Sequence, residues 1–106
     1  LYNDAAEKVD EVAERILQLG STPESRFSVY LQTSEIKEAG VVSCSKEALD
    51  LLLDYYKTLI ARERRIIEVA SDAHDDTTVS LVSDFLKEQE KTVWMLVAVS
   101  SQSCAE

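Results

Sequence analysis

The 106-residue sequence has few of the residues that form tight turns, with two glycines and one proline. Hairpin turns between strands depend on these residues, so their scarcity argues against an all-β domain and favours long helices. No apolar run approaches the roughly 20 residues of a membrane span, and no signal peptide opens the chain. The expected location is therefore the cytoplasm.

Cysteine and basic residues are also scarce. Cys44 and Cys104 stand outside any CxxC or Cys/His spacing, so no metal knuckle is predicted. The expectation is two free thiols, and the alternative is a disulfide within or between subunits. Eleven basic residues face 20 acidic ones, which gives a net charge of −9. No Lys/Arg-rich run appears, so direct binding of nucleic acid phosphates is not expected, and a cation is the more natural partner.

What the sequence does contain is apolar residues at helical spacing. The first such stripe covers residues 1–19, and Gly20 is predicted to cap its end. Because neither a start methionine nor a capping residue precedes this stripe, the chain is expected to begin inside a helix. A short helix is predicted within residues 23–37, with Thr22 as its N-cap and Pro23 as its first residue.

Two further long helices follow. One is predicted from Ser45 to about Ala70, and the next begins near Asp75 and Asp76, whose charge suits a helix N-terminus. Short connections join the long helices, except for the crossover over residues 21–44. One long crossover is typical of a ferritin-like four-helix bundle. The prediction is an all-α chain forming a single domain, with three long helices, a short crossover helix and one further long helix upstream.

Asp10 and Glu14 are the strongest candidates for chemistry. They lie four residues apart, so they share one edge of a helix, where like charges repel. Neither has a Lys or Arg three or four residues away, whereas Glu11 has a possible ion-pair partner in Arg15, four residues later. Two carboxylates at one spot suit iron. The alternative is a solvated acidic face, because Glu7 and Glu11 have the same spacing.

The segment around these carboxylates resembles the second helix of the Dps family of mini-ferritins, whose signature there is Asp-Glu-x-Ala-Glu-Arg. Here it reads Asp10-Glu11-Val12-Ala13-Glu14-Arg15. Later matches follow in the same order along essentially the whole chain. They are Tyr30-Leu31, Ile36-Lys37-Glu38, Gln89-Glu90-Lys91 and Val93-Trp94-Met95-Leu96.

The resemblance implies a subunit of a hollow homo-oligomeric shell, with twelve copies. Ferrous iron would be oxidised between two-fold related subunits, preferably by hydrogen peroxide, and stored as ferric mineral, which protects DNA. Asp10 and Glu14 would be the catalytic iron ligands from this segment. The family's two histidines and a further acidic residue, supplied by the partner subunit, have no match here. The only histidine, His74, matches neither, so the chain as written is expected to hold a loose half-site.

Other acidic residues have competing interpretations. Asp75, Asp76 and Asp84 resemble the carboxylates that line iron entry pores in the family. Helix capping explains the first two equally well, and surface solvation explains Asp84 better. Glu63 lies on an apolar stripe, where a larger bacterioferritin-like protein would keep a metal ligand inside the bundle. A buried pair with Arg or Lys is the simpler interpretation. A third alternative is a non-catalytic helical assembly module.

Overall fold

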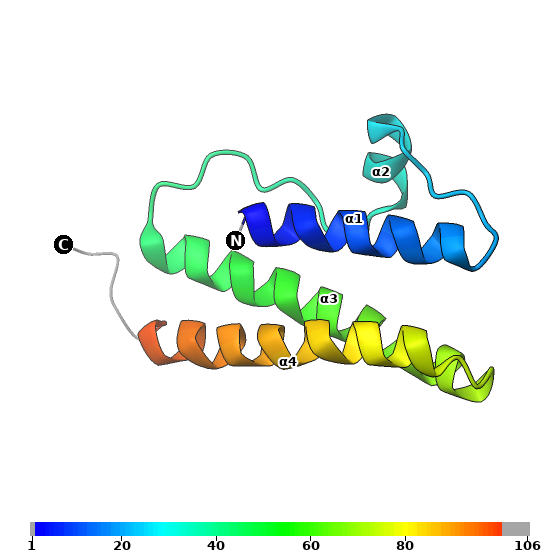
Figure 1. Cartoon of the computed structure of the whole chain (residues 1–106). Coiled ribbons are helices and arrows are strands. Elements are labelled where there is room, and N and C mark those ends of the chain that lie inside the picture. The colour runs from blue at the N-terminus through cyan, green and yellow to red at the C-terminus, as the bar shows by residue number, and fades with distance from the viewer. Residues whose placement is uncertain (1, 101–106) are drawn as a thin grey trace. The chain divides into compact units, whose positions relative to one another are not determined.

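The computed structural model describes residues 2–100, and every regular element among them is a helix (Figure 1). The helices are α1 (Tyr2–Gln18), α2 (Phe27–Thr33), α3 (Ser45–Asp72) and α4 (Asp76–Val99). The predicted all-α class, with three long helices and one short one, is confirmed. Residue contacts divide the chain into two compact units, Leu1–Ser34 and Glu35–Glu106, so the single domain stays a prediction. Within the described part, no helix combines the length and apolarity of a membrane span.

In the first unit, α1 ends as the sequence predicts. Gly20 has a φ of +89°, the left-handed conformation that glycine adopts without a steric penalty. Its amide donates to the carbonyl of Leu17 at 3.0 Å, and the amide of Ser21 donates to the carbonyl of Ile16 at 3.0 Å. These two bonds define a Schellman motif, which satisfies carbonyls that the helix end leaves open.

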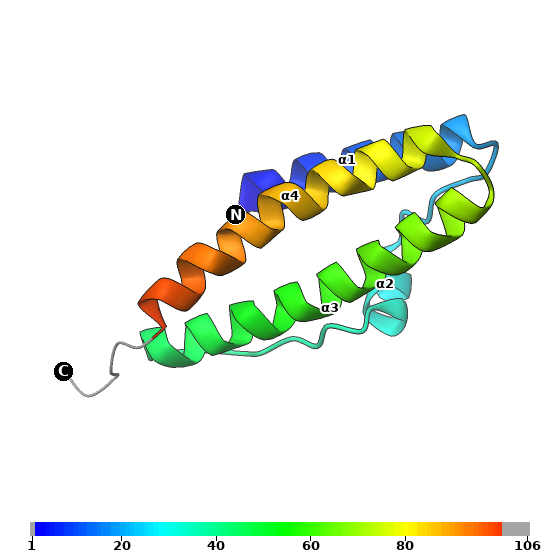
Figure 2. The same cartoon turned by 90° about the horizontal axis from the view of Figure 1, so that it is seen from below.

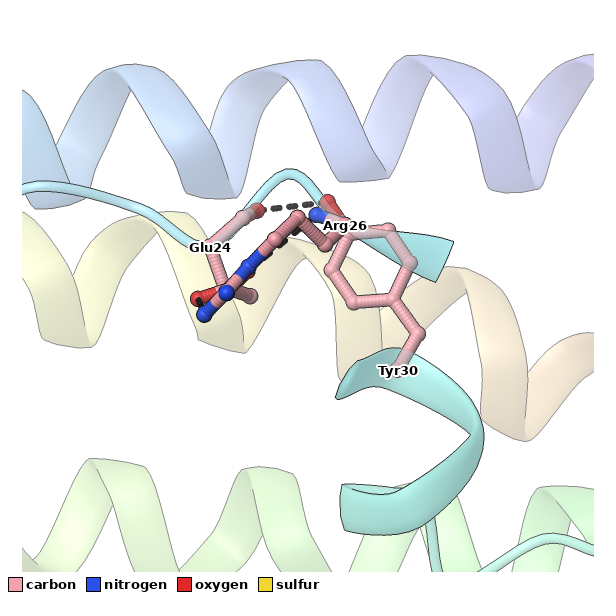
Figure 3. Close-up of polar contacts among 3 residues, drawn as sticks. All are labelled: Glu24, Arg26 and Tyr30. Atoms are coloured by element: carbon pink, nitrogen blue, oxygen red, sulfur yellow. Dashed lines mark hydrogen bonds and ion pairs between the residues drawn. The ribbon is translucent and has the colours of Figure 1, made fainter. Parts of the chain in front are cut away.

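The short helix α2 begins later than predicted, because Thr22 and Pro23 do not start it. Its N-cap is Arg26, and residues 23–26 are not helical. The carboxylate of Glu24 accepts hydrogen bonds from the Arg26 amide at 3.2 Å and the Arg26 Nε at 2.7 Å. The Tyr30 hydroxyl donates to the Glu24 carbonyl at 2.5 Å (Figure 3). These side-chain contacts compete with the helical hydrogen bonds that Thr22 and Pro23 would begin.

In the second unit, α3 and α4 form an antiparallel hairpin that is visible in both views (Figures 1 and 2). Ala70, Val82 and Phe85 are its buried apolar residues. Most of the predicted apolar stripe of α3 is only half-buried, and Leu59 and Ile66 are exposed. Two packed helices bury one narrow face each, so residues on the flanks of a wide apolar stripe stay accessible.

The turn between α3 and α4 uses a residue with a side chain where α1 uses glycine. His74 has a φ of +60°, and its amide donates to the carbonyl of Ser71 at 3.0 Å. The amide of Asp75 donates to the carbonyl of Ala70 at 2.8 Å, so this end is also a Schellman motif. A Cβ atom in the left-handed region meets the following carbonyl, which costs free energy that glycine avoids.

Replacing His74 with glycine is therefore expected to raise the free energy of unfolding by about 0.5 to 1 kcal/mol. Urea denaturation followed by circular dichroism measures this change. The matched control is His74→Ala, which keeps the Cβ atom and should give no gain. Equal stability of the glycine variant and the alanine control would contradict the proposed strain.

Candidate metal-binding half-site

Helix α1 carries both carboxylates of the predicted site. Asp10 and Glu14 lie one turn apart, and both side chains are exposed. Within residues 2–100, neither forms an ion pair or a side-chain hydrogen bond. The helix therefore presents two negative charges on one edge, where they repel each other. Binding of a cation between them would relieve that repulsion.

The cations of α1 are engaged elsewhere. Lys8 Nζ lies 2.8 Å from the Asp4 carboxylate, one turn away. Arg15 donates to the Gln18 side chain at 3.0 Å. The pair between Glu11 and Arg15 stays a prediction. Arginine can reach toward either end of its helix, and here the guanidinium reaches the amide oxygen one turn ahead.

Two carboxylates alone make an incomplete metal site. Among residues 2–100, no three or more His, Cys, Asp or Glu side chains gather closely enough to hold a metal ion. The chain's one histidine, His74, belongs to the second unit and is exposed just beyond α3. Among the described residues, the two carboxylates are therefore at most part of a metal site.

The three acidic residues compared with pore carboxylates have different surroundings. Asp75 is the N-cap of α4, and its carboxylate accepts a hydrogen bond from the Thr78 amide at 3.1 Å and another from the Thr78 hydroxyl. Asp76 lies in the first turn of α4, and Asp84 lies on the same helix; both are exposed. Capping is therefore an observed role of Asp75, while a role in a pore stays a prediction for all three.

Glu63 is buried, and its observed partner is one that sequence reasoning missed. Gln89 of α4 donates from Nε2 to the Glu63 carboxylate at 2.9 Å, and both side chains are more than nine-tenths buried. Arg64, the next residue on α3, donates to Glu90 at the surface instead. The signal available in the sequence was the position of Gln89, on the α4 stripe that includes Val82 and Leu86.

Cys44 is disulfide-bonded, which corrects the expectation of a free thiol at this position. It is half-buried and serves as the N-cap residue of α3. The expectation of a free thiol was based on the scarcity of disulfides in reducing compartments. That general rule takes no account of the residues around Cys44. Cys104 lies outside the described residues.

Comparison with known proteins relates this fold and its acidic helix to a family. The ferritin-like domain matches residues 1–102. A DNA protection during starvation protein of Porphyromonas gingivalis is 49% identical over 102 residues, which are 96% of this chain and 64% of that protein. A solved structure, the Dps protein from Vibrio cholerae, superposes with a TM-score of 0.89 at 41% identity, over 92% of this chain and 61% of that one. It is described as a member of a superfamily of ferritin-like diiron-carboxylate proteins.

Dps from Staphylococcus aureus gives a TM-score of 0.90 at 28% identity, over 96% of this chain and 68% of that one. The chain therefore belongs to the ferritin-like family, and within it to the Dps proteins. It spans a little under two thirds of the length of the P. gingivalis and V. cholerae relatives.

The capping role of Asp75 can be measured separately from any pore role. Asp75→Ala removes the acceptor for the Thr78 amide and should lower the free energy of unfolding by about 1 kcal/mol. Asp84→Ala, at an exposed position inside the same helix, should change it by less than about 0.5 kcal/mol. Urea denaturation of both variants tests this, and equal effects at the two positions would rule out the cap as the source of the difference.

Proposed function

We propose that this chain provides subunits of a cytoplasmic homo-oligomeric shell, with twelve copies, that oxidises and stores iron and thereby protects DNA. The observation that carries the proposal is the unpaired carboxylate pair of Asp10 and Glu14 on α1, in a chain of the Dps family. Oxygen ligands of this kind suit both ferrous and ferric iron. Membership of the family supports iron as the substrate, and the relatives' names support a protective role.

The proposed chemistry uses hydrogen peroxide as the oxidant. Two ferrous ions each lose one electron, and the two electrons cleave the O–O bond of peroxide. With two further water molecules the products are two FeOOH units and four protons, so atoms and charges balance. Asp10 and Glu14 would bind the iron and offset its positive charge. Further ligands from outside the described residues would complete the coordination, because the described residues hold no third ligand beside these two carboxylates.

The test is the double variant Asp10→Ala/Glu14→Ala in the assembled protein. Iron oxidation after addition of ferrous salt and peroxide is followed optically, and ferrous binding is measured without peroxide. Loss of both carboxylates should lower metal affinity and initial rate by about tenfold or more. The matched control is Glu7→Ala/Glu11→Ala, which removes an exposed pair of the same spacing from the same helix.

The rival functions predict different outcomes. A non-catalytic assembly module predicts the same iron oxidation with and without Asp10 and Glu14. A centre inside each bundle predicts that Glu63→Ala, rather than the α1 double variant, abolishes oxidation. Native mass spectrometry of each variant reports the copy number, so loss of assembly can be distinguished from loss of chemistry.

A further inference from the structure

The middle of α3 is basic in a chain that is acidic overall. Residues 57–65 contain four basic residues and one acidic residue, Glu63, whereas the whole chain has a net charge of −9. Glu63 is buried against α4, while Lys57, Arg62 and Arg65 are exposed. The exposed surface of this segment is therefore more positive than its composition suggests.

The exposed cations line one cavity within the second unit. Its volume is about 600 Å³, and its lining includes Lys57, Arg62 and Arg65. These positions recur at helical spacing on one face of α3, and the small side chain of Ala61 lies between them, where it leaves room. Glu35, from the segment before α3, and Asp54 supply the two carboxylates of the lining.

One of these cations already binds a carboxylate. Arg62 donates from Nε to Glu35, which lies 27 residues earlier in the chain. The hydrogen bond from Arg62, helped by its positive charge, holds the pKa of the Glu35 carboxyl below its ordinary value. Tyr55 fixes the same segment, because its hydroxyl donates to the Lys37 carbonyl at 3.4 Å. The carboxylate of Glu35 is therefore an anion of the protein itself within the lining of the cavity.

The other two cations, Lys57 and Arg65, can bind a ligand without the loss of a strong interaction. Arg65 donates to Glu68 at 3.2 Å, and both side chains are more than 60% exposed. Within residues 2–100, Lys57 forms no ion pair. Exposed ion pairs contribute about 1 kcal/mol or less, so a ligand with higher charge can replace their carboxylates.

We propose that this cavity binds a phosphate group, with Lys57, Arg62 and Arg65 as its ligands. Guanidinium groups match the geometry of phosphate oxygens with paired donors, and lysine adds a compact charge. The overall negative charge of the chain opposes a long polyanion, so the favoured source is free inorganic phosphate rather than a nucleic acid backbone. The site uses no residue of α1 and does not depend on the proposed iron chemistry.

Isothermal titration calorimetry with inorganic phosphate at low ionic strength tests the site. Exposed, partly neutralised cations should give a dissociation constant on the order of 1 mM. Arg62→Gln and Lys57→Gln should each weaken binding by about fivefold or more, which is the effect of losing one charge-assisted hydrogen bond. Lys87→Gln, an exposed cation on α4 outside the cavity, is the matched control and should leave binding unchanged.

Glu35→Gln separates a binding role from a structural one. If the Glu35 carboxylate competes with phosphate for Arg62, removing its charge should tighten binding severalfold. Weaker binding in this variant, no saturable binding in the unaltered chain, or equal binding in all variants would overturn the proposal. A short DNA duplex that binds through the same residues, while inorganic phosphate does not, would overturn it as well.

Discussion

A buried hydrogen bond from Gln89 to Glu63 joins α3 to α4 and constrains how the two helices pack. A buried carboxylate costs several kcal/mol unless a donor satisfies it, so the two helices are stable only where this pair can meet. A slip of one residue, about 1.5 Å along a helix, would separate the two side chains. Val82 and Phe85 fill the same interface but, being apolar, tolerate small slips better. The polar pair therefore specifies the register, and the apolar residues supply most of the attraction.

That register also determines which surface of α3 is exposed. Glu63 points toward α4, so residues on the opposite side of the helix, Lys57, Ala61 and Arg65, line the open cavity. The basic surface is thus a consequence of burying the one acidic residue of the segment. Three of the four residues 62–65 are arginine, so the basic segment is already visible along the chain, and the acidic net charge of −9 obscured it. Folding adds the separation of the buried Glu63 from the exposed cations.

Sequence predicted the helices well because their signals are local. The apolar spacing and the Gly20 cap gave the order of α1, α3 and α4 and most of their limits. The sequence-based prediction was wrong where a few side-chain contacts determine where a helix begins. At α2, Glu24 accepts hydrogen bonds from Arg26, and Arg26 replaces Thr22 as the N-cap. The position of Gln89 on the apolar stripe of α4 indicates that it is buried, but its pairing with Glu63 depends on the register of two helices, which a pattern within one helix does not determine.

The candidate site also combines a feature of one helix, which sequence predicts, with features that depend on other segments. The spacing of Asp10 and Glu14 is a property of one helix, so sequence alone places both carboxylates on one edge of α1. Further ligands would have to come from other segments, and among residues 2–100 no three or more His, Cys, Asp or Glu side chains gather closely enough to hold a metal ion. Two like charges without a partner raise the energy of α1, and a cation lowers it again. If the proposed iron site is correct, the pair that destabilises the helix alone would be stabilised by the bound cation.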